Sequence, residues 1–596
     1  MSRFAAFKSY VQAVPRILTI QVVTDTVMTV CNHGLKAVAG WALASQGRVA
    51  VTTGDFMFLF TSWQGLLLIV LALVAVYVSV TFDVNAMIAF AGHWLRGEDD
   101  SARTALRDGL VASRRFLTPT GLLVVLYMAL LAPILGVGLS ISLTKNLYVP
   151  NFITSVIFSS NLYTLAYVAF FIVFALVGFL GTFVVFGVVL DNMSVRDSIR
   201  QSVAIIRKCW LDYIWRMVLF DLVLVLCGIV VMLFTLLLAV VILNVLSMMG
   251  VGGERFSSLF LMLSGSFMLM LLLSLNSSLI QVKATERYLA YTDGLPEKVA
   301  VRRHRNHPFM ILAFAGAAAL IAIGAYILSQ SFDTAFPLES KVQVVAHRAC
   351  GTEGPENTAA GLDVAAQAAA WGAEIDIQRT ADGYYVVNHD DNFYRVAGDP
   401  RRPSEMTLAE VKALSVANAA DPSAPRVPVS TYEEMLEGSR DRLILFVELK
   451  GRTADRQMAD DAVRIARERG MLDQCVFISL KYDLIDYLED TYPDVQTGFL
   501  AFASYGNTAA LNTDYLALEE EAMSSLTISA IHAQGKKALV WTVNNQEAQR
   551  HFLLTGVDGI ITDRVTQAND LREALAARDD SERIADFCSQ MFVGSR

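Results

Sequence analysis

The sequence has few cysteines and little charge for its length, and both shortages limit what the chain can be. Only six of its 596 residues are cysteine, and their spacing matches neither a zinc site nor a disulfide framework. Charged residues make up 18% of the chain, whereas 54% of the residues are hydrophobic. This balance excludes a wholly soluble chain. A bridge between Cys350 and Cys475 stays open if that part of the chain lies outside the cytoplasm.

The charge that is present is distributed unevenly along the chain. Residues 1–330 contain 23 Lys and Arg against 15 Asp and Glu, which gives a net charge of +8. Residues 331–596 contain 25 basic and 42 acidic residues, which gives −17. Because the acidic part would repel phosphate backbones, we expect no nucleic-acid partner. The contrast predicts two domains in different surroundings, at 1–330 and 342–596, joined by a linker at 331–341.

The first domain contains repeated apolar runs that are long enough to cross a membrane. A helix needs about 20 apolar residues to span the bilayer, and seven runs approach or exceed this length. Asp25 and its threonine neighbours weaken the first run, which therefore also fits an interfacial or re-entrant segment. Two runs are so long that they must tilt, extend past the bilayer or contain a break. The seven predicted spans cover residues 17–33, 57–82, 118–143, 155–190, 213–247, 257–282 and 309–329.

Basic residues are concentrated on every second connection between these spans. They cluster in residues 1–16, 92–116, 191–216 and 283–306, while the alternate connections carry few. Loops rich in Lys and Arg remain on the cytoplasmic side of a membrane. We therefore expect a multi-pass cell-membrane protein with a cytoplasmic amino terminus and with residues 342–596 outside the cytoplasm. No cleavable signal peptide is expected, because the first apolar run begins late and lacks a small-residue exit.

The second domain opens with three short strand-like runs that carry or precede polar residues. Alternation along a strand puts residues i and i+2 on the same face, so two acids at that spacing point the same way. An Ala-rich helical pattern separates the first two runs. Such strand–helix–strand units, with histidines and acids at strand ends, are typical of the active end of a (β/α) barrel. The polar residues are His347 and Arg348 after 344–346, Glu374 and Asp376 within 373–377, and His389 after 384–388.

These blocks resemble the glycerophosphodiester phosphodiesterase family. His-Arg, Pro-Glu-Asn-Thr, Glu-x-Asp, His-Asp and Glu-Leu-Lys follow one another in the family's order, and blocks at 541–544 and 559–563 also match. The resemblance spans about residues 343–575, and the apolar spans are similar to the membrane domain of some bacterial members. It implies an N-terminal all-α transmembrane domain followed by a C-terminal α/β TIM barrel of the (β/α)8 type. Ala349 stands where the family has glycine, which could alter the loop near the phosphate.

Nine runs are strand candidates for the eight positions of such a barrel. They lie at 344–346, 373–377, 384–388, 443–450, 476–479, 497–500, 515–518, 538–543 and 559–561. The pattern alone does not tell which of them is peripheral.

Three carboxylates are the predicted metal ligands. Glu374, Asp376 and Glu448 would meet at one place, where unpaired acids repel one another and raise one another's pKa. A divalent cation resolves this repulsion, and ligands that offer only oxygen favour Ca²⁺ or Mg²⁺. The alternative is that the acids form salt bridges with Arg348 and Lys450.

Two histidines are the predicted catalytic pair, because imidazole titrates close to neutral pH. The resemblance implies that a glycerol hydroxyl beside the phosphate attacks first and gives a cyclic phosphate, which water then opens. One histidine would take the hydroxyl proton and the other would protonate the departing alcohol, but the sequence does not assign the two roles. Trp541 either walls the pocket or fills the core. The predicted catalytic residues are His347 and His389, and the predicted phosphate- and substrate-binding residues are Arg348, Lys450, Glu356 and Trp541.

The sequence therefore predicts a membrane-anchored, metal-dependent phosphodiesterase that releases an alcohol and glycerol 3-phosphate from glycerophosphodiesters. One alternative is a lysophospholipase D-like enzyme that acts on membrane lysolipids. The other is a transport or sensing protein whose barrel only binds glycerophosphodiesters, since Asp25 and Asp221 lie in or near predicted spans. The expected partners are the substrate and the lipid bilayer, and the oligomeric state stays open.

Overall fold

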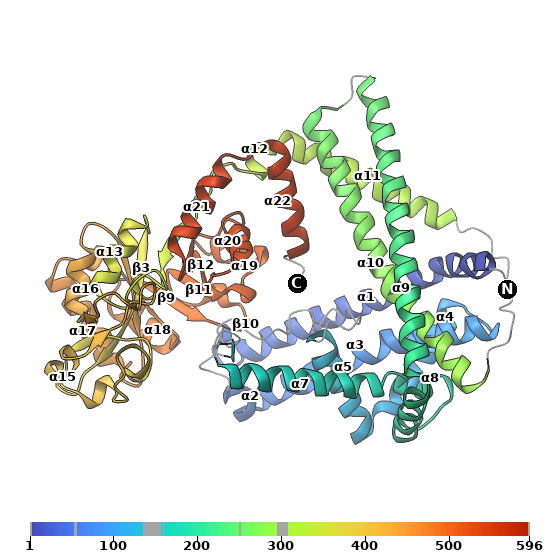
Figure 1. Ribbon diagram of the computed structural model, residues 1–596, viewed down its shortest axis with the longest axis horizontal. Helices are drawn as coiled ribbons and strands as arrows, with labels where there is room; N and C mark the ends of the chain where they lie inside the picture. The colour runs from blue at the N-terminus through green and yellow to red at the C-terminus, as the bar shows by residue number, and fades with distance from the viewer. Residues whose placement is uncertain are drawn as a thin grey trace.

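The chain folds into a helical half that ends at Gln330 and a barrel half whose first strand begins at Gln343 (Figure 1). The computed structural model describes residues 3–52, 57–134, 157–158, 160–248, 252–294, 308–502 and 504–593. The helical half runs from blue to green in Figure 1, and the barrel half from yellow to red. The predicted fold class is confirmed.

Long apolar helices make up the helical half. Among the described residues, six helices are individually long and apolar enough to cross a membrane, and a bent pair, Ala102–Phe116 and Pro119–Ala129, makes a seventh if it counts as one span. The later part of the predicted span 118–143 lies outside the described residues. The helices are α1 (Arg3–Ala44), α2 (Met57–Thr61), α3 (Trp63–Arg96), α4 (Ala102–Ser113), α5 (Pro119–Ile134), α7 (Asn161–Leu180), α8 (Val184–Leu190), α9 (Val195–Met248), α10 (Glu254–Thr292) and α11 (Pro308–Gln330).

The structure resolves the three spans that the sequence left open. Helix α1 continues through Asp25 without a break, so the first run is not a re-entrant segment. The run 155–190 is interrupted, because α7 ends at Leu180 and α8 begins at Val184. Helix α9 has 54 residues, which corresponds to about 80 Å at the usual rise per residue. It therefore extends far beyond a hydrocarbon core of about 30 Å.

Apolar side chains of the helical half point outwards. Helix α7 buries none of its residues, and Leu237 of α9 is 62% exposed. Such a surface is unfavourable in water, but lipid tails offer it an environment as apolar as a protein core. The helical half is therefore a multi-pass membrane domain.

Eight parallel strands close into the barrel, because β2 pairs with β13 on one side and with β3 on the other. The ninth strand candidate, at 384–388, forms β4 (Tyr385–Val387), which pairs antiparallel with β3 and lies outside the ring. In ring order the parallel strands are β2 (Gln343–Ala346), β3 (Gly372–Arg379), β7 (Ile444–Leu449), β8 (Cys475–Ser479), β9 (Gln496–Ala501), β11 (Tyr515–Glu519), β12 (Lys537–Trp541) and β13 (Gly559–Thr562).

Alternation along these strands gives the barrel two apolar layers. An inner layer fills the barrel and includes Phe446, Ile478 and Leu500. An outer layer, with Leu445 among its members, packs between the strands and the surrounding helices. The helices are α13 (Ala359–Gln367), α16 (Tyr432–Ser439), α17 (Arg456–Glu468), α18 (Tyr482–Thr491), α19 (Ser525–Ala533), α20 (Gln546–Phe552) and α21 (Val565–Ala576). Because both layers are filled, functional groups can gather only where the strands end.

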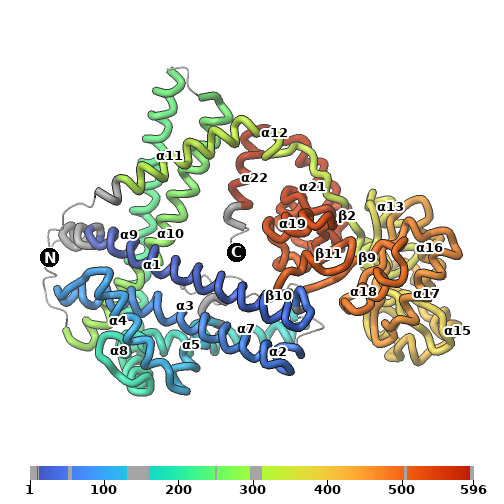
Figure 2. Tube along the Cα trace, turned by 180° about the vertical axis from the view of Figure 1, so that it is seen from behind, coloured from blue at the N-terminus to red at the C-terminus, as the bar shows by residue number. Residues whose placement is uncertain are grey.

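The C-terminal helix joins the barrel to the membrane domain. Helix α22 (Asp580–Val593) packs against α10, beside the short linker helix α12 (Phe332–Ala335) (Figure 2). Arg583 of α22 is buried, donates a hydrogen bond of 2.7 Å to the Phe336 carbonyl and forms an ion pair of 2.9 Å with Asp333. The barrel is therefore held against the membrane domain and not only tethered to it.

A strand pair makes a second contact between the two halves. Strand β1 (Ala50–Thr52), which follows α1, pairs antiparallel with β10 (Ser504–Gly506) of the barrel half. Cys350 and Cys475 are both buried and unbridged, so the disulfide that the sequence left open does not form.

Candidate active site

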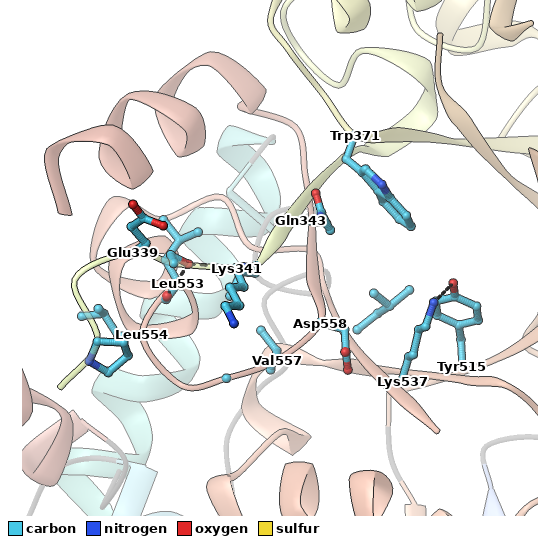
Figure 3. Close-up of a pocket in the computed structure, with 15 residues that line it drawn as sticks. Glu339, Lys341, Gln343, Trp371, Tyr515, Lys537, Leu553, Leu554, Val557 and Asp558 are labelled. Atoms are coloured by element: carbon cyan, nitrogen blue, oxygen red, sulfur yellow. Dashed lines mark hydrogen bonds between the residues drawn. The ribbon is translucent and has the colours of Figure 1, made fainter. Parts of the chain in front are cut away.

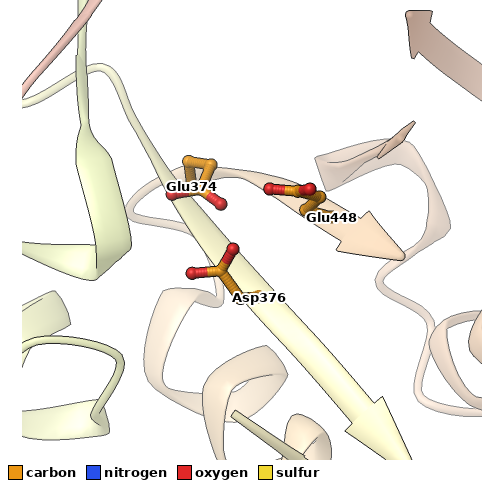
Figure 4. A group of neighbouring side chains, drawn as sticks. All are labelled: Glu374, Asp376 and Glu448. Atoms are coloured by element: carbon orange, nitrogen blue, oxygen red, sulfur yellow. The ribbon is translucent and has the colours of Figure 1, made fainter. Parts of the chain in front are cut away.

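Three acids meet inside the carboxyl end of the barrel. Glu374 and Asp376 lie two residues apart on β3, and Asp376 stands directly opposite Glu448 on the neighbouring strand β7. One carboxylate oxygen from each lies within 4.8 Å of the others (Figure 4). All three side chains are buried. The spacing of two residues that the sequence shows therefore does place both β3 acids on one face.

One lysine partly balances this cluster. Lys450 Nζ lies 2.7 Å from Asp376 Oδ1 and 2.9 Å from Glu448 Oε2. Burial by itself would raise the pKa of Asp376, but the positive charges of Lys450, His389 and Arg348 together outweigh it and lower that pKa well below its usual range. Burial and the charge of Asp376 raise the pKa of Glu374 well above its usual range. One ammonium for three carboxylates leaves the site short of positive charge.

The donor set fits a divalent cation. Oε1 of Glu374 is buried and has no hydrogen-bond partner among the described residues, an arrangement that is unfavourable for an isolated carboxylate. The three acids offer only oxygen, which suits Ca²⁺ and Mg²⁺ better than zinc. The salt bridges expected as the alternative are present through Lys450, but they do not reach this atom.

His347 follows β2 and is anchored on one side. Its Nδ1 lies 2.7 Å from Asp563 Oδ1, and its Nε2 lies 4.0 Å from Glu374 Oε2. Asp563 is itself held by Asn544, whose Nδ2 donates a hydrogen bond of 2.5 Å to its carboxylate. Burial opposes the charge of Asp563, but His347, Arg348 and the Asn544 hydrogen bond together outweigh it and lower the Asp563 pKa to about 2. The second nitrogen of His347 is therefore the one that faces the acids.

His389 is anchored in the same way from the other side of the site. Its Nδ1 lies 2.8 Å from Asp390 Oδ1, and burial lowers the His389 pKa below its usual range. Arg395 binds Asp390 through Nε at 2.7 Å. The rings of His347 and His389 lie nearly perpendicular, with centroids 6.5 Å apart. The structure thus brings the two predicted catalytic residues to one mouth, each with Nδ1 occupied.

Arg348 and Glu356 lie beside the cluster. The Arg348 backbone N–H donates a hydrogen bond of 2.7 Å to Glu374 Oε2, and its Nη1 is 3.6 Å from Glu356 Oε1. Glu356 also accepts two hydrogen bonds, of 2.6 and 2.7 Å, from Arg395. Its carboxylate is therefore engaged by two guanidinium groups, which fits a supporting position better than direct contact with an anionic substrate.

Trp541 ends β12 and packs half-buried against the inner layer of the barrel. Its indole N–H donates a hydrogen bond of 2.9 Å to the Ala517 carbonyl. The side chain therefore closes the inner layer near the carboxyl end. This position is compatible with both predicted roles, a wall of the pocket and a part of the core.

Ala349 adopts a backbone conformation that favours glycine. Its φ is +71°, and Arg348 before it also has a positive φ of +49°. The Ala349 side chain is fully buried in the outer layer. The loop therefore keeps the left-handed turn that a glycine would adopt easily, although alanine occupies the position.

Several residues that support the site were not among the predicted site residues. Asn357 holds Asp376 by donating a hydrogen bond of 2.8 Å to its carboxylate and by accepting one from its backbone N–H. Asn544 and Asp563 lie in blocks that match the family, but nothing in their spacing indicated that they would reach His347. Asp390 and Arg395 likewise act on His389 through contacts that only the folded loop creates.

A cavity lies at the opposite end of the barrel. Its volume is about 560 Å³, and none of the nine predicted site residues is among the described residues that line it (Figure 3). Gln343, Tyr515 and Lys537 contribute to its wall, and each is the first residue of its strand. In this fold the amino ends of the strands contribute to stability, whereas chemistry occurs at the carboxyl ends.

Comparison with known proteins gives matches to both halves. The membrane domain of glycerophosphoryl diester phosphodiesterase matches residues 4–326, and the glycerophosphoryl diester phosphodiesterase family matches residues 347–567. A glycerophosphodiester phosphodiesterase of Caldanaerobacter subterraneus is 26% identical over 234 residues, which cover 37% of this chain and 94% of the relative. One from Bacillus altitudinis is 24% identical over 242 residues, which cover 39% and 99%.

Among solved structures, a phosphodiesterase from Oleispira antarctica in complex with the product sn-glycerol-3-phosphate is similar to 40% of this chain and 99% of its own. The identity is 22% and the TM-score is 0.36. The membrane-domain match alone covers more than half of the 596 residues. The chain therefore belongs to the glycerophosphoryl diester phosphodiesterase family.

Proposed function

We propose that this enzyme hydrolyses glycerophosphodiesters to an alcohol and glycerol 3-phosphate on the outer side of the membrane, with a divalent cation and with two histidines as acid and base. The observation that carries the proposal is the juxtaposition of three buried carboxylates and two anchored imidazoles at one end of the barrel. The relatives named as glycerophosphodiester phosphodiesterases support the substrate class. The proposed domains are 1–330 and 342–596.

Glu374, Asp376 and Glu448 would hold the cation, which supplies positive charge to the phosphate oxygens when it is bound. Lys450 pairs with Asp376, and the Arg348 backbone N–H binds Glu374, so both side chains start beside these acids and add cationic donors for the same oxygens. A phosphodiester resists attack because its negative charge repels nucleophiles. Neutralising that charge is therefore the first task of the site.

The two imidazoles would move the protons. In each ring an aspartate occupies Nδ1, so Nε2 is left to exchange a proton with the substrate. Asp563 and Asp390 would orient the rings and stabilise the imidazolium that forms. Their negative charge is maintained at neutral pH, because both have pKa values below the usual range.

The grouping of the basic segments supports an outer location for the barrel. Arg16 pairs with Asp100 at 2.5 Å, and Arg96 pairs with Asp191 and Asp293 at 3.3 and 3.2 Å. These pairs link all four segments that are expected in the cytoplasm. The barrel instead contacts β1, which precedes the second predicted span, and the start of α10, which begins the sixth. Both contacts lie on the side opposite to the basic segments.

An assay of the purified full-length protein tests the chemistry. With glycerophosphocholine as substrate, a chelator should abolish turnover, and Mg²⁺ or Ca²⁺ should restore it. Glu374→Ala should stay inactive, whereas Glu339→Ala at an exposed position serves as the matched control. Without substrate, the cation should raise the melting temperature of the wild type and not that of Glu374→Ala. Turnover that survives complete removal of metal would overturn the metal assignment.

The same preparation separates the two alternatives. Hydrolysis of a lysophospholipid in vesicles, without hydrolysis of free glycerophosphocholine, would favour the lipid substrate. Binding of glycerophosphocholine without any turnover would favour a sensing or transport role.

Labelling of sealed spheroplasts tests the orientation. Leu526 in the barrel half is 85% exposed, so Leu526→Cys should react with a membrane-impermeant maleimide. Lys208→Cys, in a segment expected inside, should react only after lysis. The reverse pattern would place the barrel in the cytoplasm.

A further inference from the structure

A strand from the membrane domain completes a loop at the catalytic end of the barrel. Strand β1 pairs with β10 through Ala50 with Gly506, Val51 with Tyr505 and Thr52 with Ser504. The Asn507 N–H also donates a hydrogen bond of 2.9 Å to the Val49 carbonyl. Figure 2 shows β10 beside the end of α1, away from the linker that connects the two halves.

The contact is tight as well as hydrogen-bonded. Ala50 is 5% exposed and belongs to the same apolar cluster as the outer layer of the barrel. Gly506 has a φ of +111°, and a Cβ at this position would lie 2.7 Å from Leu43 Cδ1 and 2.8 Å from the Val49 carbonyl oxygen. Only glycine fits between the two halves here. The local structure is therefore built for this approach.

The loop that carries β10 starts at the catalytic end. Strand β9 ends at Ala501, and β10 begins three residues later. Segments that follow the carboxyl ends of barrel strands form the active-site rim in this fold. Without β1, residues 504–507 would lose the hydrogen bonds that they share with the membrane domain, and a surface loop without such bonds is mobile.

Phe502 connects this loop to the carboxyl end of the barrel, where the candidate active site lies. Leu500, two residues earlier, belongs to the inner layer of the barrel, and the alternation of β9, continued one residue past its end at Ala501, would direct Phe502 to the same side. Leu518 pairs with Ala501, which places Phe502 level with Glu519, and Glu519 pairs in turn with Trp541. Phe502 and Trp541 therefore lie on the same rim, and Phe502 is half-buried there.

We propose that strand β1 is a positioning element of the active site: it holds residues 504–507, and thereby positions Phe502 to form an apolar wall for the carbon atoms of the bound phosphodiester. This proposal rests on the proposed function, because it concerns the binding of the same substrate. It makes the membrane domain a part of the catalytic mouth and not only an anchor. Strand addition to an exposed edge is a common way to order such a segment.

Proline substitutions in full-length protein test the role of β1. Because Val49 and Asn507 form a hydrogen-bonded pair, the next such pair is Val51 with Tyr505, while Thr52 directs its N–H away from β10. Val51→Pro should raise KM for glycerophosphocholine about fivefold, a size in keeping with partial loss of one apolar contact, and should change kcat less than twofold. Thr52→Pro is the matched control and should leave both constants close to wild type. A Val51→Pro enzyme with the KM of the control would overturn the proposal.

A double-variant cycle tests whether β1 acts through Phe502. Phe502→Ala should raise KM by about as much as Val51→Pro, and the double variant should be no worse than either single variant. If the increases in KM of the two single variants multiply in the double variant, β1 acts independently of Phe502, and the proposed action through Phe502 is overturned. If the wild type hydrolyses no glycerophosphodiester at all, the proposed function fails, and the cycle separates that outcome from a failure of the β1 assignment.

A reversible crosslink keeps the test decisive if Val51→Pro fails to fold. Thr52 and Ser504 form a pair without hydrogen bonds, where Cα atoms lie about 4.5 Å apart, which suits a disulfide. Thr52→Cys with Ser504→Cys should crosslink on oxidation and keep the wild-type KM, as measured by peptide mass spectrometry and kinetics. The offset pair Val49→Cys with Ser504→Cys should not crosslink. Absence of the first crosslink, or equal crosslinking of both pairs, would overturn the pairing.

Discussion

The two halves of this chain contain the same apolar residue types and place them in opposite directions. Leu445 of β7 is completely buried between strand and helix, whereas Leu237 of α9 is 62% exposed. In the barrel half, apolar packing drives the fold, while in the membrane domain lipid supplies the apolar surroundings. The difference determines where polar groups can gather. In the barrel half they gather at the carboxyl end of the strands, and in the membrane domain they form pairs between helices.

The polar groups of the membrane domain do form such pairs. Thr24 donates to Asp83 at 2.8 Å, and Asn276 donates to Asp221 at 3.0 Å. Each pair joins two helices, as polar residues in membrane helices commonly do. The acids of the barrel differ, since three carboxylates share a single lysine. Three carboxylates gathered at one site are a stronger sign of chemistry than single acids that are hydrogen-bonded to a neighbouring helix.

Replacing the two histidines should have the largest effect. His347→Ala or His389→Ala should lower kcat by about 10²–10⁴-fold, because each removes one of the two imidazoles that we propose to transfer protons. Asp221→Asn in the membrane domain keeps a polar partner for Asn276 and should change turnover less than twofold. The measurement is steady-state turnover of glycerophosphocholine, with the melting temperature as a check on folding. Equal losses of kcat in the barrel variants and in Asp221→Asn would mean that the polar groups of the two halves do not differ in their importance for turnover.

The barrel and its principal site were predictable from the sequence because they depend on local spacing. Glu374 and Asp376 are two residues apart on one strand, so alternation alone places them on the same face. His347 directly follows a strand, so chain order alone places it at the carboxyl end of that strand. The motif blocks that match the family added the order in which the strands and site residues follow one another along the chain. The strand at 384–388 was predicted, but its place outside the ring was not, because that depends on its antiparallel pairing with β3.

Contacts between distant segments were not predictable. Asp563 reaches His347 across 216 positions of the chain, and Arg583 reaches Asp333 across 250. The register of β1 with β10 depends on how the two halves dock, and neither strand is longer than three residues. Short segments carry too little periodicity to indicate a partner. Such contacts appear only in the folded chain.

A matched pair of leucine substitutions tests the opposite placement of apolar residues. Leu445→Ala should destabilise the barrel by about 2–5 kcal/mol, because it leaves a cavity in a packed layer. Leu237→Ala should cost less than about 1 kcal/mol in vesicles, because lipid can occupy the space. Thermal unfolding of full-length protein in vesicles compares the two. A large loss for Leu237→Ala would mean that α9 packs against protein on this face.

Asp563→Asn should weaken the anchor of His347 without removing the imidazole. We expect a fall in kcat of about 10–100-fold, the usual cost of losing a group that orients an active ligand. Asn544→Asp is a useful companion, because it places a second negative charge beside Asp563 and should also disturb the pair. A kcat for Asp563→Asn equal to that of the wild type would show that His347 is held without this contact.

The same carboxylate should also make stability depend on pH. The Asp563 pKa lies near 2 instead of its usual 3.8, so the folded state favours the charged form. This stabilisation, about 2 kcal/mol, is complete above pH 4 and is lost as the pH falls towards 2. The difference in melting temperature between the wild type and Asp563→Asn should therefore shrink over that interval. A constant difference would mean that the pair does not contribute through its charge.

Ala349→Gly should have the smallest effect, because opposing contributions nearly cancel. A left-handed φ costs alanine about 1–2 kcal/mol, which glycine would recover. Glycine loses about 0.8 kcal/mol of methyl burial and about 0.5–1 kcal/mol of unfolded-state entropy. The net change in unfolding free energy should stay within about 1 kcal/mol, with turnover within twofold of wild type. A loss above about 2 kcal/mol would mean that the buried methyl group supports the outer layer of the barrel more than its φ strains the loop.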